Sequence, residues 1–135
     1  MTRRTILHVE DEADDRLIVK DAFARTAPQV DLVASIDGEA AIAWLTENTP
    51  DLVLLDLKLP RKSGFEVLQW VRSRPALQDV PVVIFTSSQE QKDVERATAL
   101  GANSYVVKSV DLKRLREVLR GIAELAALRP PHSPR

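Results

Sequence analysis

Residues 52–56 read Leu-Val-Leu-Leu-Asp, an unbroken apolar run that ends on a carboxylate. A run without polar alternation is typical of a strand that is covered on both faces, as in parallel sheets. Four other short runs, rich in Val, Ile and Leu, share this pattern, and they cover residues 6–9, 32–34, 82–85 and 105–107. The sequence therefore predicts a parallel sheet of five strands.

Segments with helical spacing lie between and after these runs, and each has one apolar face. The faces are marked by Leu17, Ile18, Ala22 and Phe23; by Ala41, Ile42 and Leu45; by Phe65, Leu68 and Val71; by Val94, Ala97 and Leu100; and by Leu112, Leu115, Leu119, Ile122 and Ala126. Gly101 stands where a left-handed C-cap is expected, and Pro50 and Pro81 precede strands, where a missing amide costs little. Alternating strands and helices with short links predict an α/β fold with right-handed crossovers and helices on both faces of the sheet.

Length and composition limit the kinds of protein that this chain can be. Its 135 residues suit one domain, which we expect over residues 1–128, followed by a disordered tail at 129–135 and no second domain. The absence of cysteine excludes disulfides and thiolate metal sites and fits a cytoplasmic location. A net charge of -1 argues against a general nucleic-acid or membrane binder, and no signal peptide or membrane span is expected. His8 and His132 are far apart and have no ligand partners nearby in the sequence, so a structural or solvent-exposed role is favoured over a metal pair.

Polar side chains follow four of the five predicted strands. Glu10 and Asp11 follow the first, Asp56 the third, Thr86 the fourth and Lys108 the fifth. Parallel strands end at one edge of a sheet, and ligands bind there where the strand order reverses. For the order 2-1-3-4-5 that point lies between the first and third strands, so the acidic residues fall at the reversal.

Three carboxylates in one crevice repel one another. Two unit charges about 4 Å apart cost roughly 4 kcal/mol at an effective dielectric near 20, and Lys108 alone cannot balance three acids. A hard divalent ion with oxygen ligands can, and one held by few carboxylates plus water is typically Mg²⁺. With the metal bound, Asp56 can act as a nucleophile toward a phosphoryl donor, while Lys108 and Thr86 stabilise the charge on the phosphoryl oxygens. Taken singly, these residues could be helix or loop caps or a solvated lysine, but their joint placement at strand ends favours a site.

The chain resembles the receiver domain of bacterial two-component response regulators from residue 5 to about residue 128. The resemblance is carried by Ile6-Leu7-His8-Val9-Glu10-Asp11-Glu12, by Leu54-Leu55-Asp56-Leu57-Lys58-Leu59-Pro60-Arg61-Lys62-Ser63-Gly64, by Phe85-Thr86-Ser87, and by Gly101-Ala102-Asn103-Ser104-Tyr105-Val106-Val107-Lys108. The text around Glu10–Arg16 and Thr86-Ser87-Ser88 resembles the subgroup that is paired with bacterial phytochrome kinases. The fold implied is the flavodoxin-like receiver fold.

The resemblance implies a role for each matching residue. Asp56 would accept phosphate from a partner histidine kinase, in a switch protein rather than an enzyme. Glu10, Asp11, Asp56 and the backbone carbonyl of Lys58 would hold the metal. Thr86 and Tyr105 would be the switch pair, and Lys108 would bind the phosphoryl group.

Two positions depart from the family pattern. Ser109 stands after the lysine, where the family usually has a proline with a cis peptide bond. A cis bond without proline costs about 3 kcal/mol, so the sequence leaves the isomer open. Glu10 stands where many relatives carry Asp, and its longer side chain favours a water-bridged metal contact.

Two other functions compete with this interpretation. A magnesium-dependent phosphohydrolase with an aspartyl nucleophile commonly carries a second Asp two residues later as general acid, but here that position is Lys58. A pseudo-receiver, a binding module that is never phosphorylated, usually lacks an acid or the lysine, and both are present here.

The last predicted helix has a wide apolar face. On a wheel of about 100° per residue its apolar side chains cover roughly 140°, whereas covering a sheet needs a stripe nearer 100°. Val118 and Leu125 lie at one margin beside Arg114. This surplus predicts a symmetric homodimer through this helix, with the preceding helix and strand, in which Arg114 and Arg116 could pair with Asp93 or Glu90. A wide core stripe, or a surface for a different protein, remains an alternative.

Overall fold

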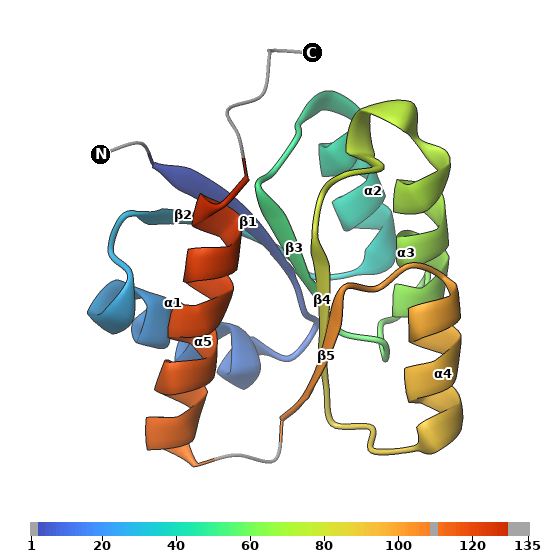
Figure 1. Cartoon of the computed structure of the whole chain (residues 1–135). Coiled ribbons are helices and arrows are strands. Elements are labelled where there is room, and N and C mark those ends of the chain that lie inside the picture. The colour runs from blue at the N-terminus through green and yellow to red at the C-terminus, as the bar shows by residue number, and fades with distance from the viewer. Residues whose placement is uncertain (1–2, 109–110, 130–135) are drawn as a thin grey trace.

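The computed structural model describes residues 3–108 and 111–129 (Figure 1). Its strands form one parallel sheet in the order β2-β1-β3-β4-β5. They are β1 (Arg4–Val9), β2 (Val30–Ser35), β3 (Leu52–Leu55), β4 (Val82–Thr86) and β5 (Ser104–Val107). The predicted strand order is therefore confirmed, and each predicted run lies inside its strand.

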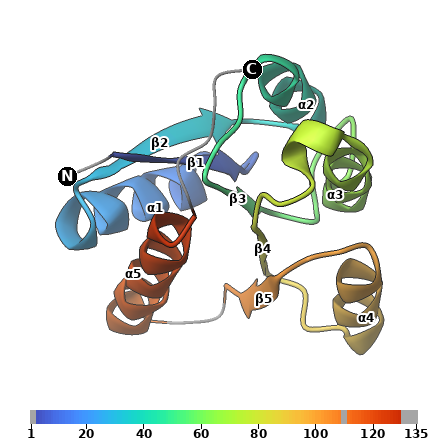
Figure 2. The same cartoon turned by 45° about the horizontal axis from the view of Figure 1, so that its top comes forward.

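Helices cover both faces of this sheet, with α1 and α5 on one face and α2, α3 and α4 on the other (Figure 2). The helices are α1 (Ala13–Thr26), α2 (Gly38–Glu47), α3 (Gly64–Ser73), α4 (Gln91–Ala99) and α5 (Leu112–Ala127), with a 3-10 turn at Pro75–Leu77. Three of the helices begin at a side-chain cap: Asp37, Ser63 and Asp111 accept hydrogen bonds from the amides of Ala40, Glu66 and Arg114. Such caps satisfy amides that a helix leaves unpaired at its start.

The core is divided by the sheet into two apolar layers. Neighbouring residues of β1 serve different layers, because Ile6 packs toward α1 and α5 while Leu7 packs toward α2 and α3. All four residues of β3 are fully buried, as expected of a central parallel strand. Gly101, which follows the C-cap residue Leu100 of α4, has a φ of +104°, which confirms the left-handed residue predicted there.

Three side chains assigned to the core in the sequence are exposed instead. Leu17 is 66% exposed, Ile18 42% and Leu112 51%. Helix α1 turns Ala22 and Phe23 inward as predicted, but Val19 joins them there in place of Leu17 and Ile18. Leu112 is the first residue of α5 and lies beside the exposed Leu17 and Ile18 of α1. The wide apolar face of α5 is used differently, since Val118 and Leu125 are half-buried and pack against the core.

Some expectations concern residues outside the described part of the chain. They include the state of the tail beyond Arg129, the side chain of His132 and the isomer of the Lys108–Ser109 peptide bond. Within residues 3–108 and 111–129, no helix combines the length and the apolar character that crossing a membrane would require.

Candidate functional site

The acidic residues lie together because of the register between β1 and β3. Val9 pairs with Leu55, so the next residues, Glu10 and Asp56, leave the sheet side by side. The carboxylates of Glu10, Asp11 and Asp56 each place an oxygen within 4.8 Å of the others. Glu10 and Asp56 are buried, and Asp11 reaches solvent. The predicted acidic cluster at the strand-order reversal is therefore formed.

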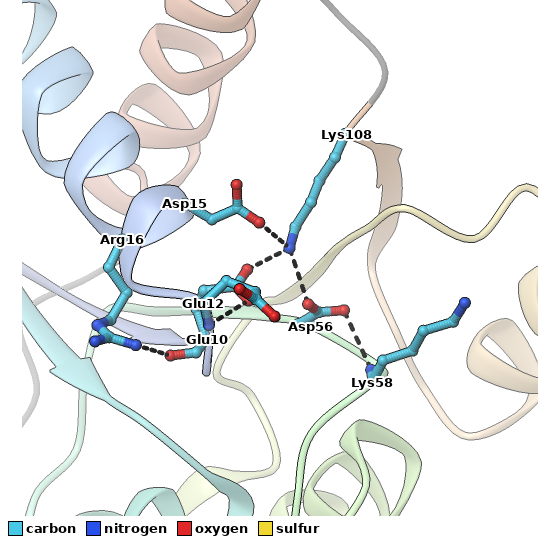
Figure 3. A network of polar contacts seen from close by, with 7 residues as sticks. All are labelled: Glu10, Glu12, Asp15, Arg16, Asp56, Lys58 and Lys108. Carbon is cyan, nitrogen blue, oxygen red and sulfur yellow. Dashed lines mark hydrogen bonds and ion pairs between the residues drawn. The ribbon is translucent and has the colours of Figure 1, made fainter.

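Lys108 reaches this cluster from the end of β5. Its backbone amide donates to the carbonyl of Thr86 at 2.8 Å, which fixes where the side chain begins. Its Nζ donates to the carboxylates of Glu10, Asp15 and Asp56, the last two at 2.9 Å (Figure 3). An ammonium has three N–H donors, so all three are in use. The lysine is thus the centre of a network that joins β1, α1 and β3.

The chain after Asp56 passes close to the start of α3. A Cβ at Gly64 would lie 2.1 Å from the backbone oxygen of Asp56, so only glycine fits there. The Gly64 amide donates to Leu57 O at 3.0 Å, and the Lys58 amide donates to Asp56 Oδ1 at 3.2 Å. The Lys58 side chain is exposed and extends away from Asp56 (Figure 3). These contacts hold the Asp56 carboxylate in one orientation.

Burial raises the pKa of both buried acids, Glu10 and Asp56, whereas Lys108 lowers it. Burial raises the pKa of Glu10 to about 7, and the nearby charge of Asp56 adds to the effect, although the Lys108 ammonium opposes it. Burial would also raise the pKa of Asp56, but the hydrogen bond and charge of Lys108 outweigh it and hold that pKa below its ordinary value. The Lys108 pKa is raised, because its three carboxylate partners outweigh its burial. Asp56 is therefore ionised at neutral pH, as a nucleophile must be.

The cluster has the chemistry of a site for a hard divalent cation. All three donors are carboxylates, and Mg²⁺ and Ca²⁺ prefer oxygen ligands. Two of them are buried, so a cation would relieve repulsion that water screens poorly. Glu10, Asp11 and Asp56 could therefore hold such an ion, while two of them, Glu10 and Asp56, also accept hydrogen bonds from Lys108.

The two residues predicted to form the switch pair, Thr86 and Tyr105, lie on the neighbouring strands β4 and β5. The Thr86 hydroxyl is buried and makes no hydrogen bond of ordinary geometry in the described part of the chain, although it is close enough to Asp56 to help lower that pKa. The Tyr105 hydroxyl donates to Ser88 O at 3.0 Å, and its ring is half-buried against the layer that contains α4. The Ser88 hydroxyl in turn donates to Asp93 of α4 at 2.6 Å.

Two residues of α1 belong to the site but were not predicted from the sequence. Asp15 is a partner of Lys108, and Arg16 donates to the backbone oxygen of Glu10 at 2.9 Å (Figure 3). A signal existed for Asp15, since it follows Asp11 by four residues and α1 begins at Ala13. Because the first turn of α1 closely follows the acidic residues at the end of β1, an acid there could have been expected near the cluster, although its contact with Lys108 also depends on how α1 packs on the sheet.

The sequence and the fold both match one known family. A family model described as the response regulator receiver domain matches residues 6–120. The chain belongs to this family. In sequence the receiver domain is 38% identical over 126 residues to response regulator Rcp1 of Synechocystis sp., with 88% of this chain and 86% of that protein covered.

Solved structures agree with this assignment. The phosphorylated cyanobacterial phytochrome response regulator RcpA superposes on this receiver domain with a TM-score of 0.87 at 33% identity, covering 96% of this chain and 98% of the other. The Mn²⁺-bound form of Rcp1 superposes with a TM-score of 0.81 at 35% identity, covering 98% of this chain and 99% of the other. The match spans nearly the whole of each chain, so the family assignment covers the acidic cluster and Lys108 alike.

Proposed function

We propose that this protein is a response regulator that accepts a phosphoryl group on Asp56 from a sensor histidine kinase, in a reaction that requires Mg²⁺. The observation that carries this function is the pairing of an ionised, buried Asp56 with Lys108, beside the carboxylates of Glu10 and Asp11. A carboxylate prepared in this way can attack phosphorus, and the lysine beside it can neutralise charge on the transferred group.

Each side chain has a role in the transfer. An Asp56 oxygen forms a bond to phosphorus while the bond from phosphorus to the donor's nitrogen breaks, which leaves an acyl phosphate on the receiver. Lys108 keeps a donor on the phosphoryl oxygens, and the buried Thr86 hydroxyl supplies another once it turns toward them. Glu10, Asp11, Asp56 and the Lys58 carbonyl would hold the Mg²⁺, which would neutralise negative charge during transfer. The Lys58 amide donates a hydrogen bond to Asp56 Oδ1 and so keeps the attacking carboxylate oriented.

The partner kinase is assigned from the relatives. RcpA is a phytochrome response regulator, and this chain matches it over 96% of its length. We therefore assign this receiver to a bacterial phytochrome kinase and to the cytoplasm, where a kinase obtains its ATP. We also assign residues 1–128 to one receiver domain that signals through its surface rather than by an enzymatic reaction of its own.

The two competing functions are less well supported. A phosphohydrolase would need an acid two residues after Asp56, and the exposed Lys58 side chain points away from that carboxylate. A pseudo-receiver would not need Lys108 and Asp56 in contact, yet their atoms lie 2.9 Å apart.

Mass spectrometry after treatment with acetyl phosphate and Mg²⁺ tests this function. The wild type is expected to gain one phosphoryl group, and Asp56→Asn to gain none. The variant should remain folded, with a free energy of unfolding within about 1 kcal/mol of wild type, because lost repulsion with Glu10 offsets the lost Lys108 pair. Equal phosphate incorporation in both proteins would refute the assignment of Asp56.

A further inference from the structure

We propose that Asp15 is a positioning residue that holds Lys108 in the resting protein and competes with the phosphoryl group for it. This role presupposes the phosphoacceptor function proposed above and adds a residue on α1 that sets how long Asp56 stays phosphorylated. It follows from the number of donors on the lysine, the exposure of its three partners and the space beside Asp15.

The first step concerns the donors of Lys108. Its Nζ has three N–H groups, and Glu10, Asp15 and Asp56 accept all of them in the resting protein. A phosphoryl group on Asp56 adds acceptor oxygens within reach of the same ammonium. The lysine can donate to them only if it releases, or shares, one of its present partners.

The second step identifies the partner that is released. The Glu10 side chain is 0% exposed and that of Asp56 is 7% exposed, so neither could regain water if the lysine left. The Asp15 side chain is 36% exposed. Leaving a buried carboxylate unpaired costs far more than releasing one that water can solvate. Asp15 is therefore the exchangeable partner.

The third step concerns the room for this exchange. A pocket of about 220 Å³ lies directly beside the pair, and its lining includes Asp15, Lys108, Ile18 and Leu112. Because Asp15 lines this space, its carboxylate has room to turn within it. Glu10 and Asp56 do not line it.

Two consequences follow for the rates. While Asp15 holds a donor of Lys108, that donor is withheld from the incoming phosphoryl group, and the Asp15 charge repels an anionic phosphodonor. After transfer, Asp15 continues to compete for the lysine. Removing its charge should therefore speed phosphorylation and slow loss of the phosphoryl group, each by about three- to fivefold, the range that a partly exposed ion pair supports.

The test compares Asp15→Asn with Asp14→Asn. Asp14 lies in the same first turn of α1, is exposed and is not a partner of Lys108, so its replacement removes the same charge without touching the lysine. Phosphorylation by acetyl phosphate with Mg²⁺ is followed by mass spectrometry. Dephosphorylation is followed after the donor is removed. Asp15→Asn should change both rates as stated, Asp14→Asn should change neither by more than about 1.5-fold, and Asp15→Glu, which keeps the charge, should restore rates near those of wild type.

Further readouts separate this role from a structural one and from failure of the proposed function. Thermal unfolding and Mg²⁺ affinity of Asp15→Asn should match those of wild type, since Asp15 is outside the cluster of Glu10, Asp11 and Asp56. If wild type is phosphorylated but Asp15→Asn and Asp14→Asn give the same rates, Asp15 has no positioning role. Rates changed equally in Asp15→Asn and Asp15→Glu would also overturn it. A wild type that takes up no phosphate would instead refute the function itself.

Discussion

The side chain of His8 is almost completely buried. It lies on β1, two residues before Glu10, and is 1% exposed. Its Nδ1 has no hydrogen-bond partner in the described part of the chain. Burial, helped by the nearby Lys108 charge, lowers its pKa from 6.5 to about 4. The native state therefore holds this imidazole neutral over a range of pH in which the unfolded chain protonates it.

Acid should destabilise the protein through this residue. A folded-state pKa below the unfolded value means that the unfolded state binds the extra proton. The stabilisation is fully present above pH 6.5 and is lost as pH falls toward about 4, by up to about 3 kcal/mol. Denaturant unfolding from pH 7 to pH 4, in the absence of divalent ions, should show a shallower fall for His8→Leu than for wild type. Parallel curves for the two proteins would contradict this explanation.

The metal site can be tested at Asp11, which takes no hydrogen bond from Lys108. Asp11→Ala should abolish measurable Mg²⁺ binding to the unphosphorylated protein, because it removes one of three clustered carboxylates without freeing the lysine. Titration calorimetry measures the affinity. Asp14→Ala on α1 is the matched control and should bind as wild type does. Equal affinity of wild type and Asp11→Ala would place the metal elsewhere.

At the scale of single residues, the sequence predicted which residues meet at the site better than it predicted which side chains contact each other. The placement of Glu10, Asp11, Asp56 and Lys108 at one edge followed from parallel strands, because strand ends meet there whatever the side chains do. Asp15 was missed because its contact depends on the phase of α1 against the sheet. The rotation of α1 about its own axis is set by the packing of Val19 and Phe23 against the sheet, and the spacing of residues in the sequence does not determine it.

Among the helices, α4 is the one least anchored to the core. Its only buried residue is Ala97, whereas Val94 and Leu100 are half-buried. The loop before it is tied by two hydrogen bonds, from Tyr105 to Ser88 O and from the Ser88 hydroxyl to Asp93. Elements with few buried contacts open at low cost and are the usual moving parts of a switch.

Phosphorylation is expected to move this element. The Thr86 hydroxyl should turn to the phosphoryl group, vacate space toward Tyr105 and let that ring turn inward, which would break its bond to Ser88. Hydrogen exchange over residues 86–105 should differ between free and phosphorylated wild type. Thr86→Ala should still be phosphorylated but show a much smaller difference. Identical exchange in the free and phosphorylated wild type would place the switch elsewhere.

How well the sequence predicted each strand and helix face depended on how deeply that element is buried. All five strands were located. The central strands β3 and β4 are continuous apolar runs because both of their faces are buried, whereas the edge strands β2 and β5 are only partly buried and were found from shorter runs. The ends were less certain: β1 and β2 extend beyond the predicted runs into Arg4 and Val30, which have only one neighbouring strand to pair with at that end. Apolar faces of helices were wrong at Leu17, Ile18 and Leu112, where apolar spacing continued past the surface that the sheet covers.

At the scale of the whole molecule, α5 and the edge strand β5 offer a surface for self-association. In the described sheet the edge strand β5 pairs only with β4, and α5 covers the face of the sheet that it shares with α1. Leu112 of α5 borders Leu17 and Ile18 of α1, whereas Val118 and Leu125 lie on another flank of the helix. Both are half-buried, so part of their surface already packs within the chain and only the rest is free for a partner.

We expect a symmetric dimer through this flank of α5 together with α4 and β5. Sedimentation velocity at micromolar concentration should give a dimer, and Val118→Asp should convert it to a monomer, since a buried charge at a twofold contact is met by its own copy. Leu112→Asp, a change of the same kind on the flank next to α1, should leave the dimer intact. A monomeric wild type with and without phosphate would exclude the dimer, and a dimeric Val118→Asp would place the interface elsewhere.

The span of the Lys108 network has a consequence for the newly made protein. Lys108 and Glu10, which are in contact, stand 98 positions apart in the chain, and β5 is the last strand to be synthesised. During translation, Glu10, Asp11 and Asp56 leave the ribosome well before their ammonium partner does. A nascent chain therefore carries an acceptor carboxylate without the lysine that lowers its pKa and would receive the phosphoryl group. Under the proposed function, we therefore expect that Asp56 becomes competent for phosphotransfer only after β5 has joined the sheet.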